Sequence, residues 1–267
     1  MKNRLLNFFN NNCYLKDGLF HLGGMTIMLM KSIGFILQGR VDIHETITQM
    51  KRIGNDSLPM VSITALATGM VLVVQMGNQF AKMGAESYVG GVVALAQARE
   101  LAPILTAIVV AGRIGSAMTA EIGTMKVTEQ IDALETLAVS PVRYLVVPRL
   151  LAGVVMLPFL TIYANLIGIA GGLFVAVAQI NMSIVSFRES VVSQLMINDI
   201  VGGLIKALAF GLIISLVGCY RGFITKGGAE GVGASTTGSV VTAIMLIFVS
   251  NYFLSVLIVN FVEAFLY

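Results

Sequence analysis

Charged residues are almost absent from several long stretches of this sequence, and their spacing constrains the fold more than any other feature. Residues 150–187 carry no charge, and neither do residues 57–81. At about 1.5 Å per residue, a helix of about 20 residues crosses the roughly 30 Å hydrocarbon core of a bilayer. Over the whole chain 12% of the residues are charged, about half the fraction in a typical soluble domain. We therefore predict an all-α integral membrane protein.

The long apolar stretches, three of them without any charge, predict five transmembrane helices. In chain order we expect them at 57–81, 88–125, 150–187 with a bend at Pro158, 199–220 and 239–262. Cytoplasmic loops of membrane proteins are enriched in Lys and Arg, so the N-terminus should be cytoplasmic and the C-terminus external. The basic residues that this topology places in cytoplasmic loops are Lys51, Arg52, Lys126, Arg143, Arg149, Arg221 and Lys226, against Lys82 and Arg188 outside.

Residues 1–56 are expected to form cytoplasmic or interfacial helices, followed by a five-span unit at 57–267. Residues 14–38 are apolar, but Lys31 would lie near mid-bilayer if they crossed the membrane, which is costly. A helix in the cytoplasmic interface with snorkelling lysines fits better, and a span with Lys31 facing the protein interior is the alternative. Residues 41–55 predict a short amphipathic helix, with Asp42 and Glu45 at capping-box spacing.

Arg99 and Glu100 are adjacent charges inside apolar sequence, shortly before Pro103. Two interpretations are open: a neutralising ion pair with a neighbouring helix, or a polar contact in a cavity that holds an amphiphilic substrate. We favour the second, because ionisable residues within membrane spans are commonly functional. For Arg113 and Glu121, which are about two turns apart, we expect a structural role.

A second candidate site is a short helix at about 127–138, which Pro141 ends. Its apolar residues recur at helical spacing and its acidic residues remain exposed. The apolar positions are Val127, Ile131, Leu134 and Ala138, and the acidic ones are Glu129, Asp132 and Glu135. We expect Thr128 to cap its start. The helix is too short to span a membrane, so it is either a solvated connector or a docking ridge for a cytoplasmic partner.

The sequence lacks the signatures of an enzyme or a nucleotide-binding protein. The glycine-rich residues 221–238 predict a flexible cytoplasmic loop, with no preceding strand and no G-K-[ST]. Any ATPase that energises this chain must therefore be another polypeptide. Cysteine and histidine are too scattered to predict a metal site, and the absence of a basic run gives no reason to expect nucleic acid.

Four motifs identify a family resemblance. They are A-R-E-L-A-P at 98–103, A-G-R-I-G-S-A-M-T-A-E-I-G-T-M at 111–125, T-E-Q-I-D-A-L at 128–134 and P-V-R-Y-L-V-V-P-R at 141–149. With them the chain resembles the MlaE-type permease family, the membrane subunits of ABC lipid transporters associated with MCE-domain proteins. The weaker likeness extends over roughly residues 20–265.

The resemblance implies a homodimeric ABC permease in the bacterial inner membrane, with an interfacial N-terminal helix and five spans in each chain. Cytoplasmic ATPase subunits, which would bind ATP and Mg²⁺, would dock on a coupling helix at Glu129, Gln130, Asp132, Leu134 and Glu135. An MCE-domain protein would lie on the external side. The substrate would be phospholipid, moved between the inner and outer membranes. The lipid-binding residues would be Arg99 and Glu100, with Leu72, Gln79, Phe80 and Met83.

Two other classes of function remain open. A secondary carrier or channel would use Arg99, Glu100 and Lys206 as an ion path, and the purified chain alone would then support gradient-driven flux. A structural scaffold subunit would tolerate removal of the Glu100 charge without a transport defect.

Overall fold

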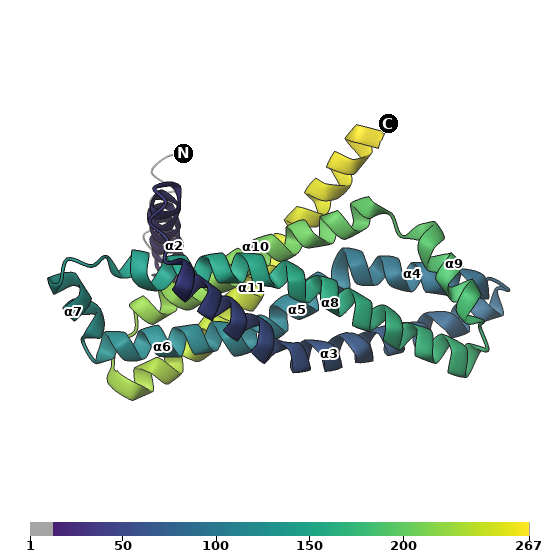
Figure 1. Ribbon diagram of the computed structural model, residues 1–267, viewed down its shortest axis with the longest axis horizontal. Coiled ribbons are helices and arrows are strands. Elements are labelled where there is room, and N and C mark those ends of the chain that lie inside the picture. The colour runs from purple at the N-terminus through teal and green to yellow at the C-terminus, as the bar shows by residue number, and fades with distance from the viewer. Residues whose placement is uncertain (1–12, 267) are drawn as a thin grey trace.

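The computed structural model describes residues 13–266, and the first twelve residues of the predicted N-terminal unit lie outside this range. Within it the regular structure is helical and no strand occurs. Long helices run side by side along one axis, with the short α7 at one end of the bundle and α9 at the other (Figure 1). The continuous long helices are α2 (Cys13–Leu37), α3 (Ile43–Lys82), α8 (Val147–Ile180), α10 (Ile197–Phe223) and α11 (Gly228–Leu266).

The second predicted span is a composite helix with two π-helical segments. It comprises α4 (Val89–Ala96), η2 (Gln97–Leu101), α5 (Ala102–Val110), η3 (Ala111–Gly115) and α6 (Ser116–Val127). The short connecting elements are η1 (Glu86–Tyr88), α7 (Gln130–Thr136), η4 (Val142–Val146) and α9 (Ile184–Gln194).

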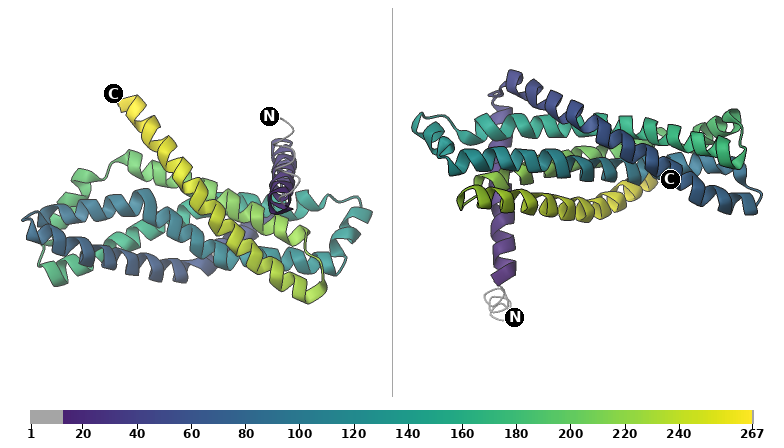
Figure 2. Two further views of the ribbon diagram at one scale, coloured as in Figure 1. Left: turned by 180° about the vertical axis from the view of Figure 1, so that it is seen from behind. Right: turned by 90° about the horizontal axis from the view of Figure 1, so that it is seen from below.

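Six helical stretches among the described residues are long and apolar enough to cross a membrane, and five of them correspond to the predicted spans. The sixth is Gly18–Leu37 in α2. This helix runs across the bundle rather than along it (Figure 2). With the bundle axis along the membrane normal, α2 therefore lies in the membrane plane, which fits the interfacial helix expected from Lys31. Sequence hydropathy alone could not separate the two placements, because it carries no information on direction.

Two segment boundaries differ from the predictions. The short helix expected at 41–55 and the first span form one helix, α3, which runs through Pro59, so the predicted boundary between residues 56 and 57 falls inside it. The predicted glycine-rich loop at 221–238 is shorter, because α11 already begins at Gly228. In both places the charged or polar sequence marks where a helix leaves the apolar layer, and the helix itself continues beyond that point.

Capping explains where α3 begins. The Asp42 carboxylate accepts a hydrogen bond from the Glu45 backbone N–H at 3.1 Å, as the capping-box spacing predicts. The Glu45 side chain does not close the box on Asp42. It accepts instead from the Gln49 amide at 2.8 Å, one turn further along the helix.

Glycines bring α3 and α8 into close contact. A Cβ at Gly69 would collide with the backbone carbonyl of Gly168, and a Cβ at Gly168 would collide with the Gln97 side chain. A Cβ at Gly172 would lie 3.1 Å from the Val73 side chain. The G-x-x-x-G pair at 168 and 172 therefore has the packing role that its spacing indicates.

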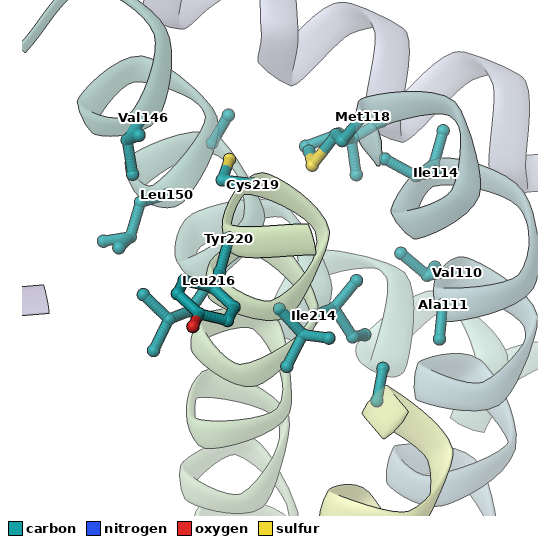
Figure 3. Close-up of a cluster of buried hydrophobic side chains, with 14 of the residues drawn as sticks. Val110, Ala111, Ile114, Met118, Val146, Leu150, Ile214, Leu216, Cys219 and Tyr220 are labelled. Carbon is teal, nitrogen blue, oxygen red and sulfur yellow. The ribbon is translucent and has the colours of Figure 1, made fainter. Parts of the chain in front are cut away.

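The main apolar core lies in the half of the bundle nearer α7. There the α10 side chains, including Ile214 and Cys219, lie between Leu150 of α8 and Met118 of α6 (Figure 3). This packing fixes α10 against the composite span, and so it positions the polar residues at the other end of α10.

Candidate functional site

Two salt bridges join the π-helical segment η2 to α10. Arg99 Nε donates to Asp199 Oδ1 at 2.6 Å, and Lys206 Nζ donates to Glu100 Oε1 at 2.5 Å. Asp199 and Lys206 are about two turns apart, so they share one face of α10. The adjacent charges of η2 thus pair with separate partners on one neighbouring helix.

Helix α11 completes the arrangement around Glu100. The Asn251 amide donates to Glu100 Oε2 at 3.0 Å, and the Ser255 hydroxyl donates to Glu100 Oε1 at 3.0 Å. Lys206 also donates to Ser255 Oγ at 2.8 Å and to the Arg99 carbonyl at 3.0 Å. The Lys206 ammonium therefore has three partners, which compensates for its nearly complete burial.

The local backbone explains why Arg99 and Glu100 reach this position. The Ala102 N–H bonds to the Gln97 carbonyl, five residues earlier, which makes η2 a π-helical turn. Such turns are frequent at functional sites. On the facing helix, Gly203 has no Cβ that would collide with the Ala98 carbonyl, so α10 can approach η2 closely. Each of these backbone features holds the charged pair against α10.

The paired charges line a cavity of about 200 Å³ between η2, α10 and α11. Its wall is polar on the side of Arg99, Glu100 and Lys206, and it is apolar where Ile258 and Val259 contribute. Arg99 and Glu100 keep about half of their side-chain surface exposed, so they remain accessible while paired. Pockets for drug-sized molecules enclose roughly 300–1,000 Å³, so this cavity is smaller than a typical ligand pocket.

The first interpretation of Arg99 and Glu100 is confirmed, because each forms an ion pair with a neighbouring helix. Both residues also line a cavity, and its role in holding an amphiphilic substrate stays a prediction. Sequence reasoning missed three of the partners, Asp199, Asn251 and Ser255. The available signals were the spacing of Asp199 and Lys206 on one helical face and the i, i+4 spacing of Asn251 and Ser255 in an apolar span.

The other four predicted lipid-binding residues lie elsewhere, on α3 and just after it. Leu72 and Phe80 are partly buried against the apolar cluster formed with α4, α8 and α9. Gln79 is exposed, and Met83 follows α3 with 79% of its surface exposed. None of the four lines the cavity at Arg99 and Glu100 in the single chain.

The predicted coupling helix is present as α7, at the end of the bundle (Figure 1). Ile131 is buried and Leu134 is partly buried against the main core. The polar residues that we assigned to docking, Glu129, Gln130, Asp132 and Glu135, are exposed. Asp132 forms a salt bridge with Lys126 at 2.8 Å. The helix is thus anchored by one apolar face and presents an acidic face outward.

The expected capping role of Thr128 is wrong. Its hydroxyl donates backward to the Thr124 carbonyl at 2.8 Å, so it belongs to the end of α6. Glu129 precedes α7 in a left-handed conformation with φ of 61° and no side-chain cap. Thr128 is thus the C-cap residue of α6, and Glu129 takes the N-cap position of α7 that was expected for Thr128.

Glu121 has the structural role expected for it. It pairs with Arg52 of α3 and accepts from Arg149 of α8 at 3.1 Å, so it ties α6 to both helices. Arg149 is buried and also donates to the Leu145 carbonyl at 2.9 Å. Arg113 has a looser contact, with the Met60 sulfur at 3.8 Å.

Among the described residues, a helical bundle with six membrane-length apolar helices is the architecture of a multi-pass membrane protein. Residues 46–257 match the family described as Permease MlaE, and the chain belongs to this family.

Named relatives agree with this assignment. A probable ABC transporter permease protein of Synechocystis is 48% identical over 82% of this chain and 84% of its own length. A probable ABC transporter permease protein of Rickettsia typhi is 40% identical over 85% of this chain and 88% of its own. The Arabidopsis thaliana chloroplast protein TRIGALACTOSYLDIACYLGLYCEROL 1 is 42% identical over 82% of this chain and 63% of its own. The chain is therefore an ABC transport subunit rather than a catalytic enzyme, and its family implies an ATPase partner.

Proposed function

We propose that this permease moves phospholipids between the inner and outer membranes of a bacterium, energised by a separate ATPase. The observation that carries the proposal is the cavity at Arg99 and Glu100, in which paired charges meet apolar side chains. An amphiphile needs such a wall, because its headgroup and its acyl chains require opposite surroundings. The relative in Arabidopsis thaliana is named after a diacylglycerol lipid, which supports a lipid substrate.

The proposed orientation places α7 in the cytoplasm and α9 in the periplasm. The basic residues at the α7 end of the bundle, including Lys126, Arg143 and Lys226, support it. The N-terminus is then cytoplasmic, the C-terminus is periplasmic, and the membrane is the bacterial inner membrane. An MCE-domain protein would receive or supply lipid at the α9 end.

The ATPase would dock on the acidic face of α7, and ATP and Mg²⁺ would bind in that partner. Movement of α7 would reach the lipid cavity along a continuous path, because α6, η3, α5 and η2 follow one another in a single composite helix. In a homodimer, closure of the ATPases would narrow a cavity at the dimer axis lined by residues 58–81 and 88–112. Lipid headgroups near Arg99 and Glu100 would then be expelled to, or accepted from, the external partner.

The test is purification of the tagged chain from its host in mild detergent, with identification of co-purifying proteins and lipids. The double variant Asp132→Lys with Glu135→Lys reverses the exposed charge of α7 and should lose the ATPase while keeping bound phospholipid. ATPase that remains bound and lipid-responsive would show that the docking assignment is wrong. Wild-type protein without phospholipid, or gradient-driven flux by the chain alone, would contradict the proposed function.

The matched control reverses two charges at the opposite end of the bundle. Glu86 in η1 and Glu189 in α9 are both exposed. The variant Glu86→Lys with Glu189→Lys changes the net charge by the same amount, and it should retain the ATPase.

A further inference from the structure

A second groove lies on the outer surface between α3 and α8, away from Arg99 and Glu100. Its volume is about 870 Å³, and one of its walls is apolar, with Leu58, Met156, Phe159 and Leu160. Phe159 exposes 61% of its surface there, although it lies in the middle of a membrane-length helix. The groove is therefore shaped for an apolar chain.

Polar groups line one end of this groove: Lys51, Arg52, Asn55 and Asp56, all on α3. The salt bridge to Glu121 occupies Arg52. Lys51 is exposed and Asp56 is half-buried, and neither takes part in a salt bridge with any side chain that the structure describes. The polar end thus offers one cation and one anion about a turn and a half apart on α3.

Contacts with α2 give the depth of the polar end. His21 of α2 lies 3.1 Å from the Tyr220 hydroxyl of α10, which places Tyr220 at the level of the helix in the membrane plane. Two residues before Tyr220, the Gly218 carbonyl accepts a hydrogen bond from the Thr119 hydroxyl of α6 at 3.0 Å. Glu121 and Tyr220 each follow that contact by two residues, on helices that both run toward the α7 end (Figure 1). Glu121 and its partner Arg52 therefore lie at the membrane surface.

The groove extends from this surface to about mid-bilayer. The Ser62 and Tyr163 hydroxyls lie 2.8 Å apart and tie α3 to α8 at its inner end. From Arg52 to Ser62 the rise along α3 is about 15 Å, which is half of the roughly 30 Å hydrocarbon core. The groove thus has the length of one leaflet, with its charges at the headgroup level.

We propose that this groove binds one glycerophospholipid of the leaflet on the α7 side, with a zwitterionic headgroup that carries an amine. Lys51 and Asn55 bind the phosphate, Asp56 binds the ammonium, and one acyl chain lies along Leu58 and Phe159. A zwitterion fits better than an anionic headgroup because Asp56 would repel the latter. The site requires only that the chain spans a bilayer, so it does not depend on the proposed direction or substrate of transport.

The experiment uses the full chain purified with its ATPase and measures retention of phosphatidylethanolamine and phosphatidylglycerol by native mass spectrometry. Both probes are titrated into delipidated complex that carries Glu100→Gln with Lys206→Met, so that the cavity at η2 contributes less and Lys206 leaves no unpaired charge. The Asp56→Asn variant should weaken phosphatidylethanolamine binding about tenfold and leave phosphatidylglycerol unchanged or stronger. The Lys51→Ala variant should weaken both lipids about tenfold.

The control variants are Glu86→Gln and Lys82→Ala, which remove one charge of each sign at the other end of the bundle. Equal affinity for the two lipids in the parent, or no change in Asp56→Asn, overturns the proposal. A melting temperature measured for every variant separates loss of binding from loss of folding.

A diazirine-labelled phosphatidylethanolamine locates the site independently of affinity. Labelled peptides should contain residues 47–58 and 156–163. Labelling spread evenly over the exposed apolar residues would show a general lipid shell and overturn the proposal. Cross-linking of Phe159→Cys to a second copy of the chain, or to the ATPase, would show that a protein covers the groove and would also overturn it.

Discussion

At the scale of single residues, the Glu100–Lys206 pair sets the properties of the candidate site. The Lys206 side chain is 4% exposed and that of Glu100 is 44% exposed, so the two charges are unequally solvated. Removing the carboxylate would leave a buried ammonium without a counter-charge, and breaking a buried pair costs about 3–5 kcal/mol. The partial exposure of Glu100 places the expected loss at the lower end of that range.

We predict that Glu100→Gln lowers the thermal stability of the detergent-solubilised protein. Glu100→Gln combined with Lys206→Met should restore stability, because an apolar side chain replaces the unpaired charge. Both variants should lose lipid transport in proteoliposomes. The measurements are melting temperature and lipid transfer, and a single variant as stable as the wild type would show that the pair contributes nothing to folding. A double variant that still transports lipid would favour a scaffold role for these charges.

The chemistry of the candidate site could be predicted in part from the sequence. Arg99 and Glu100 stand out because charges are rare in apolar segments, and that signal needs no knowledge of tertiary structure. Their partners could not be assigned, because the choice of Asp199, Lys206 and Asn251 depends on how α10 and α11 pack against η2. The π-helical turn was not predictable either, because no residue in Gln97–Leu101 breaks an α-helix.

At the scale of helices, the contact between α3 and α8 depends on backbone proximity. Gly69 faces the Gly168 carbonyl so closely that a Cβ has no room, and the obstructing atoms belong to backbone. Backbone cannot move aside as a flexible side chain can, so the two helices would have to separate. Overpacking of this kind costs about 1–3 kcal/mol.

Gly69→Ala should therefore reduce folded yield and melting temperature, and Gly112→Ala should be neutral. Gly112 lies in η3, where an added Cβ meets no heavy atom within 4 Å, and it provides the matched control. Fluorescence-detected gel filtration of the two variants in one detergent checks this. Equal profiles would mean that α3 and α8 tolerate a wider separation than their glycines indicate.

The positions of the helices were more predictable than their ends. Long uncharged intervals located three of the five spans, because hydrocarbon excludes charge over a fixed thickness. The other two were located as long apolar stretches although they contain charges such as Glu100 and Lys206. The charge pattern did not locate the part of α3 that precedes Ser57, or the early start of α11 at Gly228, because a helix can extend into water beyond the bilayer. The angle between α2 and the bundle depends on tertiary contacts such as His21 with Tyr220, which no periodicity reveals.

At the scale of the whole molecule, α11 is the least covered of the long helices. In the most apolar 18-residue stretch of α11, 11% of the residues are buried, compared with 61% in the corresponding stretch of the Val142–Ile180 span. Large exposed side chains recur along it at helical spacing, at Val241, Met245, Phe248, Tyr252, Val256 and Val259. Such a stripe has either lipid or a second chain against it. The Glu100 contacts with Asn251 and Ser255 place the cavity next to this stripe.

We predict that α11 of one copy packs against α11 of another, in the proposed homodimer. Met245→Cys, in a chain whose two native cysteines are replaced by serine, should form a covalent dimer with a short bifunctional thiol reagent in membranes. Phe174→Cys on α8 is the control, because Phe174 is also exposed and apolar (69% against 63% for Met245) but lies outside the stripe. Cross-linking at Phe174 without cross-linking at Met245 would assign the interface to another face. A dimer through α11 would bring two copies of the Glu100 cavity to one axis, where a single pair of ATPases could act on both.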